Sequence, residues 1–316
     1  MQIDFHHAVT YVVARLAGFE HEKANTVAHA AQYVDDATNV DLIRFDNRAL
    51  FSRTASAHKM IDTRNIRGLA NHSTWLPFHF LPGNGGLPAG QNPDGSFIEK
   101  IICTPNSHIA QDMVSDAIAD KNKPYGLHRL GVAMHVYADT WAHQGFVGEI
   151  NSINDVDDAS AKNTTIFGSI MSKIKDNVDN AIPPLGHGRA WTYPDMPYLD
   201  WHYKNRNGVK IERNNTRDFC EAAQHMCLAM QRFREVEESG ISEQDMAAIK
   251  SFFLSFKDDE GEKRHEKWLE ILRNGSIPSI DPIEVSYPIG EDAGSWKKEA
   301  LGSSFDLEVH PYAYSS

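Results

Sequence analysis

The sequence lacks several features that would assign it to a familiar class. No run of eighteen apolar residues occurs, so a membrane-spanning helix is not expected. Only three cysteines are present, Cys103, Cys220 and Cys227, and no two of them have CxxC spacing. So few thiols in an odd number argue against a disulfide framework and favour reduced cysteines. The first residues show neither the basic nor the apolar segment of a secretory signal peptide, so we expect a cytoplasmic protein.

Basic residues are also scarce relative to acidic ones. The chain has 31 lysines and arginines against 43 aspartates and glutamates, which gives a formal net charge of −12. Generic nucleic-acid binding needs basic contacts to phosphates, so a nucleic-acid partner is not expected. A phosphate-containing substrate is not excluded, because bound divalent ions can dominate the local field. The HExxH, GxSxG, P-loop and GxGxxG motifs are all absent.

The composition is that of a globular protein, with 41% hydrophobic and 23% charged residues among 316. Apolar residues at helical spacing predict helices over residues 5–17, 20–37, 107–120, 126–146, 164–181, 216–237, 242–257 and 259–273. Glycines and prolines break the pattern between residues 41 and 100, which predicts a loop-rich excursion. We expect an all-α fold, with a single multi-helix domain over residues 1–275 around a buried polynuclear metal site. An extended tail, residues 276–316, would pack on that domain.

The segment from Gly126 to Phe146 carries the strongest functional signal. On an α-helix, with about 100° per residue, His135, Asp139 and His143 fall on one face. The neighbouring face carries an apolar stripe: Leu127, Leu130, Met134, Tyr137 and Trp141. Imidazole and carboxylate are ligands that zinc prefers, and a buried aspartate between histidines is costly unless a cation offsets its charge. The segment therefore predicts a metal-binding helix with Asp139 as a central, bridging ligand.

Further candidate ligands are spread along the chain. Asp35 and Asp36 end the second predicted helix, where the helix dipole disfavours two carboxylates without a cation. His79 lies between two phenylalanines, and His187 lies between two glycines that allow the backbone to approach closely. The predicted metal ligands are His6, Asp36, His79, His135, Asp139, His143, His187 and Asp195.

The sequence does not decide between Asp35 and Asp36. Whichever of the two is not committed to metal is the candidate general base. Arg189 is a candidate for contacting a substrate phosphate, and Trp141 belongs to an aromatic surround that suits a small or lipidic substrate.

Several short motifs resemble those of a known family. They are Phe5-His6-His7 with Val9-Thr10-Tyr11, Gln32-Tyr33-Val34-Asp35-Asp36, Phe78-His79-Phe80, the stretch from His135 to Gln144, and Gly186-His187-Gly188 with Pro194-Asp195. Together they resemble an uncharacterised bacterial family of unknown function, over residues 1 to about 200. The order of histidines and acids also resembles, more remotely, the zinc-dependent phospholipase C and fungal single-strand nuclease superfamily.

The remote resemblance implies a cluster of up to three zinc ions among helices. Two departures stand out: the classical enzymes ligate one zinc through a mature N-terminal tryptophan, where this chain has Met1, and His187 with Asp195 replaces a helical pair of ligands. We expect a phospholipase C-like hydrolase that uses two or three zinc ions, or other divalent metals, to activate water against a lipid head group or small phosphoester. The alternatives are a single-strand nuclease of the same superfamily and a non-catalytic, metal-stabilised helical interaction protein.

Overall fold

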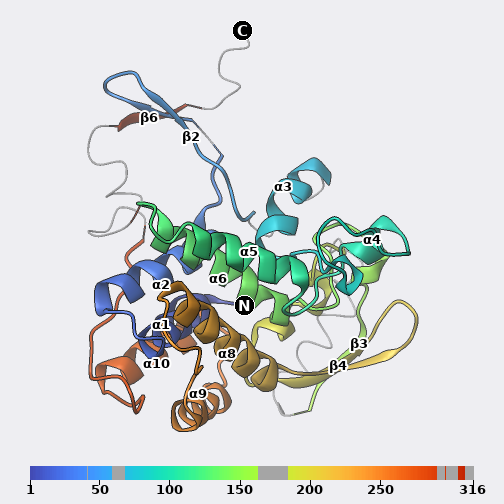
Figure 1. The fold of residues 1–316 in the computed structure, drawn as a ribbon. Helices are drawn as coiled ribbons and strands as arrows, with labels where there is room; N and C mark the ends of the chain where they lie inside the picture. Colours follow the sequence, from blue (N-terminus) through green and yellow to red (C-terminus); the bar gives the residue numbers. More distant parts are fainter. Residues whose placement is uncertain (41, 59–67, 163–183, 290–295, 297–304, 310–316) are drawn as a thin grey trace.

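Helices form the body of the protein, and two small sheets lie at its periphery (Figure 1). The computed structural model describes residues 1–40, 42–58, 68–162, 184–289, 296 and 305–309. The helix predicted over residues 164–181 lies outside the described residues. The fold is mainly helical, as predicted, but it is not purely all-α, because the sequence analysis missed two small sheets. Among the described residues, no helix has the length and apolar character needed to cross a membrane.

Most of the predicted helices are present among the described residues, and two further helices lie between residues 41 and 100, in the segment predicted to be rich in loops. The helices are η1 (Asp4–Val9), α1 (Thr10–Leu16), α2 (His21–Asp36), α3 (Gly68–Phe78), α4 (Phe97–Lys100), α5 (His108–Ala119), α6 (Gly126–Ala142), α8 (Asn215–Phe233), α9 (Glu243–Ser255) and α10 (Gly261–Arg273). Short 3-10 turns are η3 (Asn84–Gly86), η4 (Ser152–Asn154), η5 (Gly188–Ala190) and η6 (Tyr193–Asp195). The side chains of Ser107 and Ser242 accept backbone hydrogen bonds at the starts of α5 and α9, as expected of helix N-caps.

The strands are short and all antiparallel. One sheet has the order β2-β1-β6, and the other has the order β3-β4-β5. Their bounds are β1 (Leu42–Phe45), β2 (Leu50–Ser52), β3 (Asp157–Ala161), β4 (Asp200–Lys204), β5 (Lys210–Asn214) and β6 (Phe305–Val309). Strands of 3 to 5 residues offer too few alternating positions for a periodic signal, which is why sequence patterning missed them.

Helix α6 runs through the centre of the body and packs against α2, α5 and α8. Its predicted apolar stripe is confirmed, because Leu130, Met134 and Trp141 lie in the main hydrophobic core. Helix α2 approaches α6 closely at Gly131. A Cβ atom there would lie 2.3 Å from the carbonyl oxygen of Val27 and 2.5 Å from the Cβ of Ala30. Glycine at this position therefore lets the two helices that carry candidate ligands press together.

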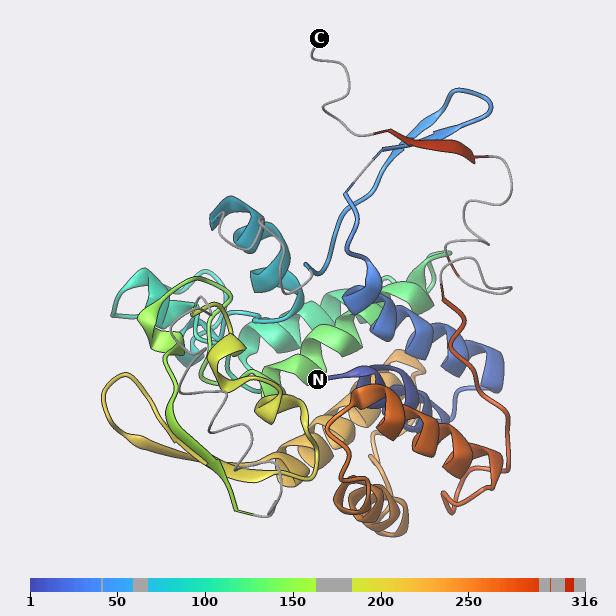
Figure 2. The same ribbon diagram turned by 180° about the vertical axis from the view of Figure 1, so that it is seen from behind.

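The first residues of the chain enter the middle of the body, where the N label stands in Figure 2. A buried ion pair fixes them, because the Arg264 guanidinium of α10 lies 2.5 Å from an Asp4 carboxylate oxygen. Arg264 also donates to the side-chain oxygen of Gln2, at 2.7 Å. Beyond α10, the described part of the predicted tail buries Ile277 and Val285 in the core. These contacts hold η1 against α10.

Candidate metal centre

Candidate ligands from separate parts of the chain meet on one side of α6. Three groups of side chains bring ligand atoms within 4.8 Å of one another: His6 with Asp35 and His135; His79 with His135 and Asp139; and His143 with His187 and Asp195. We call these eight residues together the ligand cluster. They come from η1, the end of α2, the residue after α3, α6 with its C-cap, and the loop before β4. The sequence-predicted ligands are thus brought together, with Asp35 in the place predicted for Asp36.

Asp139 lies at the centre of the ligand cluster and is 1% exposed. His6 Nε2 and His79 Nδ1 each lie 3.2 Å from one of its carboxylate oxygens. His135 Nε2 lies 3.3 Å from Asp139, one helical turn away on α6. A carboxylate approached by imidazoles from several elements has the arrangement of a bridging ligand.

Backbone carbonyl groups fix the orientation of four histidine rings in the ligand cluster. The pairs are His135 Nδ1 with Ala31 O at 2.8 Å, His79 Nε2 with Ser56 O at 2.8 Å, His143 Nδ1 with His79 O at 2.7 Å, and His187 Nδ1 with Trp191 O at 2.8 Å. A nitrogen facing a carbonyl oxygen must carry the hydrogen, so the opposite nitrogen presents a lone pair. Metal-binding histidines are held in this way by their surroundings.

Several buried polar atoms of the ligand cluster have no hydrogen-bond partner among the described residues. They include Nδ1 of His6. Nε2 of His6 and Oδ1 of Asp195 also lack a partner in hydrogen-bond geometry, although an Asp139 oxygen and the Met1 amine, respectively, lie 3.2 Å from them. The His6 ring stacks on that of His135 with centroids 3.7 Å apart, so its nitrogens cannot bond to that ring edge-on. Buried polar atoms without partners are costly. A cation bound between these groups would satisfy them, so the residues fit a metal site.

The pKa values of several of these side chains favour the protonation states that bind metal ions. Burial lowers the pKa of His6, His135 and His143 to about 4, so their rings are neutral near pH ~7. Burial opposes ionisation of Asp139, but the neighbouring His143 and the Met1 amine hold the pKa of its carboxyl well below its usual range. Neutral imidazoles beside an ionised carboxylate are the states that bind divalent cations.

The α-amine of Met1 also reaches the ligand cluster, which sequence reasoning did not foresee. It lies 2.7 Å from Asp139 Oδ1, 3.2 Å from Asp195 Oδ1 and 3.4 Å from His143 Nε2. Burial alone would lower its pKa, but the charges of Asp139 and Asp195 raise it to about 11. A backbone amine has no side-chain signature, so only the fold reveals its position among the carboxylates.

The remaining predicted site residues lie away from the centre. Asp36 follows Asp35 on α2, points to the hydroxyl of Tyr287 and belongs to none of the three groups. Trp141 is 2% exposed in the hydrophobic core, beside the ring of Tyr137, so it does not line the ligand cluster. Neither residue lies where it was predicted. Successive helical side chains point about 100° apart, so Asp36 and Trp141 point away from the ligand residues of their own helices.

Arg189 follows His187 by two residues and forms an ion pair with Asp155. It therefore lies near the ligand cluster, and its contact with a substrate phosphate stays a prediction. The ligand cluster is most accessible at Asp35 and His187, whose side chains are 29% and 19% exposed. A substrate would therefore approach from these edges.

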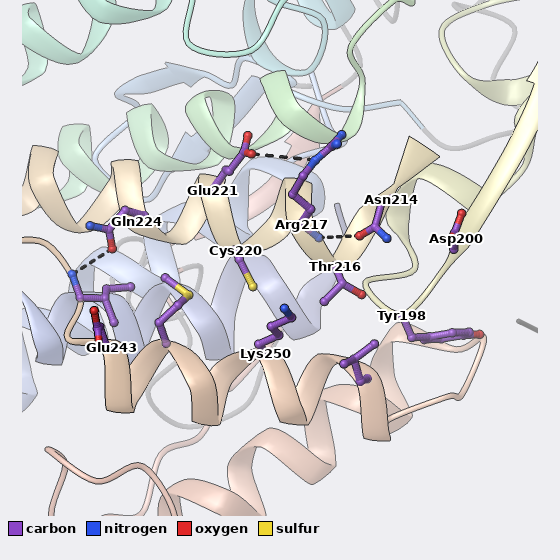
Figure 3. Close-up of a pocket in the computed structure, with 13 residues that line it drawn as sticks. Tyr198, Asp200, Asn214, Thr216, Arg217, Cys220, Glu221, Gln224, Glu243 and Lys250 are labelled. Carbon is purple, nitrogen blue, oxygen red and sulfur yellow. Dashed lines mark hydrogen bonds and ion pairs between the residues drawn. The ribbon is translucent and has the colours of Figure 1, made fainter. Parts of the chain in front are cut away.

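A separate pocket of about 890 Å³ lies between α8 and α9 (Figure 3). Arg217 and Glu221 form an ion pair on one wall, and Cys220 and Lys250 face the space between the helices. No member of the ligand cluster is among the described residues that line it. The pocket is therefore distinct from the candidate metal centre.

A protein-family model, described as a family of unknown function (DUF6765), matches residues 1–311. The matched range includes the whole ligand cluster. No curated protein and no solved structure matches the chain.

Proposed function

The chain belongs to DUF6765, a family of unknown function, and we propose that it is a metal-dependent phosphoester hydrolase whose ligand cluster binds zinc. One observation carries the proposal: four histidines, each oriented by a backbone carbonyl, direct their other nitrogen toward buried carboxylates. Two buried carboxylates, those of Asp139 and Asp195, share the single ammonium of Met1, and such a core is a poor choice for stability alone because buried charges need compensation. It is a suitable environment for more than one divalent cation.

Two sets of residues would hold the ions. His6, Asp35, His79, His135 and Asp139 surround one end of the ligand cluster, and His143, His187 and Asp195 surround the other. When bound, zinc supplies Lewis acidity, which polarises a phosphoester and lowers the pKa of water toward neutrality. Asp139 holds negative charge between the two sets, so it would offset the charge of cations held by either set.

Asp35 is best suited to exchange a proton with solvent and substrate. Its side chain is the most exposed of the ligand-cluster carboxylates, at 29%. Burial raises the pKa of its carboxyl, while His6 and His79 lower it in part. A carboxylate with a raised pKa at the open edge can accept a proton and pass it to water. Asp36, by contrast, accepts a hydrogen bond from Tyr287 outside the cluster.

The net charge of the chain and the exposure of the ligand cluster favour one class of substrate over others. A formal net charge of −12 opposes the binding of long polyanions, so we place single-strand nuclease activity second to hydrolysis of a small or lipidic phosphoester. A non-catalytic, metal-stabilised helical protein is the alternative from another class. The open edge at Asp35 supports catalysis over it, because a purely structural metal site is closed to solvent.

Hydrolysis of bis-p-nitrophenyl phosphate by the purified chain tests the proposal. We expect turnover that is lost with chelator and restored by zinc, with little dependence on salt. Asp139→Asn should lower turnover by about 100-fold or more, because it removes the central charge between the ions. Asp112→Asn changes an exposed carboxylate on α5 and serves as the control. Zinc uptake without turnover of any phosphoester would favour the non-catalytic alternative, and salt-sensitive cleavage of single-stranded DNA alone would favour the nuclease.

A further inference from the structure

The β1–β2 hairpin projects from the helical body in both views of the molecule (Figures 1 and 2). Every residue from Asp46 to Ser52 is exposed. Two of them are large apolar side chains, Leu50 at 63% and Phe51 at 51% exposure. Two adjacent large apolar side chains exposed to water lower the solubility of a protein. Their exposure therefore indicates that they contact a binding partner.

The base of this hairpin is anchored beside the ligand cluster. The amide of Ser56 donates to Ala37 O at 2.9 Å, and its hydroxyl donates to Val34 O at 2.7 Å. The carbonyl oxygen of Ser56 faces His79 Nε2 at 2.8 Å. Six residues separate Asp35 from the start of the hairpin, and Ser56, three residues after its end, contacts a ligand histidine. The hairpin therefore leaves the body next to Asp35, the most exposed carboxylate of the ligand cluster.

We propose that this hairpin, residues 42–53, docks on a phospholipid surface and brings lipid phosphoesters to the ligand cluster. The segment carries three arginines and one aspartate, in a chain whose formal net charge is −12. Arg44 pairs across the sheet with Leu50, so a cation and an apolar side chain share one face. Apolar side chains that enter the head-group region beside arginines are typical of interfacial binding. The lipid substrate rests on the proposed function, whereas the docking itself does not.

A second copy of the chain is the other occupant to consider, because β2 is an edge strand of the sheet β2-β1-β6. Strand pairing along that edge would involve only Leu50–Ser52. So short an edge offers few backbone hydrogen bonds, and short edge strands are a means by which proteins avoid such pairing. The combination of apolar and cationic side chains beside an open site fits a lipid surface better.

Flotation of the full-length chain with phosphatidylcholine vesicles, with and without phosphatidylglycerol, tests the docking. We expect binding to both, tighter with the anionic lipid. The double substitution Leu50→Ser and Phe51→Ser should weaken binding about tenfold or more. Arg48→Gln should weaken binding to anionic vesicles about fivefold and leave binding to neutral ones unchanged. Val209→Ser, which changes an apolar residue 53% exposed after β4, is the matched control and should bind as the unaltered chain does.

The same variants separate this proposal from the proposed function. All of them should cleave the soluble bis-p-nitrophenyl phosphate at the unaltered rate, while the double variant should lose cleavage of vesicle lipid. Unweakened vesicle binding by a double variant with an unchanged melting temperature would overturn the docking. A change from dimer to monomer in the double variant, without a change in vesicle binding, would assign the hairpin to a contact between copies instead. Hairpin-dependent binding by a chain that cleaves no phosphoester would retain the docking and reject the hydrolase.

Discussion

Four of the five histidines of the ligand cluster have one ring nitrogen at a backbone carbonyl oxygen, which directs the other nitrogen toward the buried carboxylates. One ring nitrogen of His135 faces the carbonyl oxygen of Ala31, and one of His79 faces the carbonyl oxygen of Ser56. Neither carbonyl could be named from the sequence, because each belongs to an element distant from its histidine. The sequence predicted which residue types form the site, but not the backbone contacts that orient the histidine rings.

Asp35 and Asp36 allow the sharpest comparison at this scale. Asp35→Asn should lower metal affinity by about tenfold or more, because it removes an anionic oxygen from the group with His6 and His135. Asp36→Asn should leave metal content unchanged, since its carboxylate contacts Tyr287 and no ion ligand group. Elemental analysis of both variants after dialysis measures this. Loss of metal in Asp36→Asn with retention in Asp35→Asn would reverse the assignment.

The choice between these two aspartates shows where sequence reasoning stops. A shift of one residue along α2 turns a side chain by about 100°. The register that aims Asp35 at the ligand cluster is set by packing of α2 on α6, so no local signal in the sequence specifies it. His135 and His143 could be predicted as ligands from the sequence, because each lies four residues, about one helical turn, from Asp139.

Acid sensitivity should follow from His265, a buried histidine outside the ligand cluster. Burial lowers its pKa to about 4, below the usual value of about 6.5. The folded state therefore loses stability as the pH falls from about 6.5 toward 4, because the unfolded chain takes up the proton first. Between pH ~7 and ~5 this residue accounts for about 2 kcal/mol of lost stability.

Urea unfolding at the two pH values tests this contribution. His265→Gln keeps a polar group near His7 Nδ1, which lies 2.8 Å from His265 Nε2. Its free energy of unfolding should fall by about 2 kcal/mol less than that of the unaltered chain. Equal losses in both proteins would show that His265 does not titrate between the two states.

The contact between α2 and α6 matters most among the elements. These helices carry Asp35, His135 and Asp139, and Gly131 allows their close approach. Gly131→Ala should cost about 1–3 kcal/mol of stability, because the added methyl group overlaps the backbone of Val27. It should also lower zinc affinity by moving the helices apart. Val132→Ala, at the next residue of α6, is the control for loss of apolar contact, and thermal melts with zinc titration measure both effects.

Gly131→Ala with an unaltered melting temperature and zinc affinity would show that the helices can separate without affecting the site. The helices themselves were predictable because apolar residues recur along them at helical spacing. The sheets were not, because their strands are short and β1 pairs with β6 from the far end of the chain. The hairpin proposed to dock on lipid thus lay inside a segment predicted to be a loop.

For the whole molecule, the main consequence of the fold is a charged, ligand-rich centre inside a helical body. Asp139 and Asp195 are buried, and their described neighbours are imidazoles and the Met1 amine. A bound cation should therefore stabilise the entire fold, by about 4 kcal/mol when free zinc exceeds its dissociation constant about a thousandfold. Such coupling would distinguish a metal centre from a set of histidines that only fill a core.

Elemental analysis of the full-length chain, loaded with zinc and then dialysed, tests the central claim most directly. We predict more than one zinc ion per chain, released by chelator together with a fall in melting temperature. Asp139→Asn should retain fewer ions than the unaltered chain when treated in the same way. A chain that takes up no zinc, and melts at the same temperature with and without it, would contradict the claim.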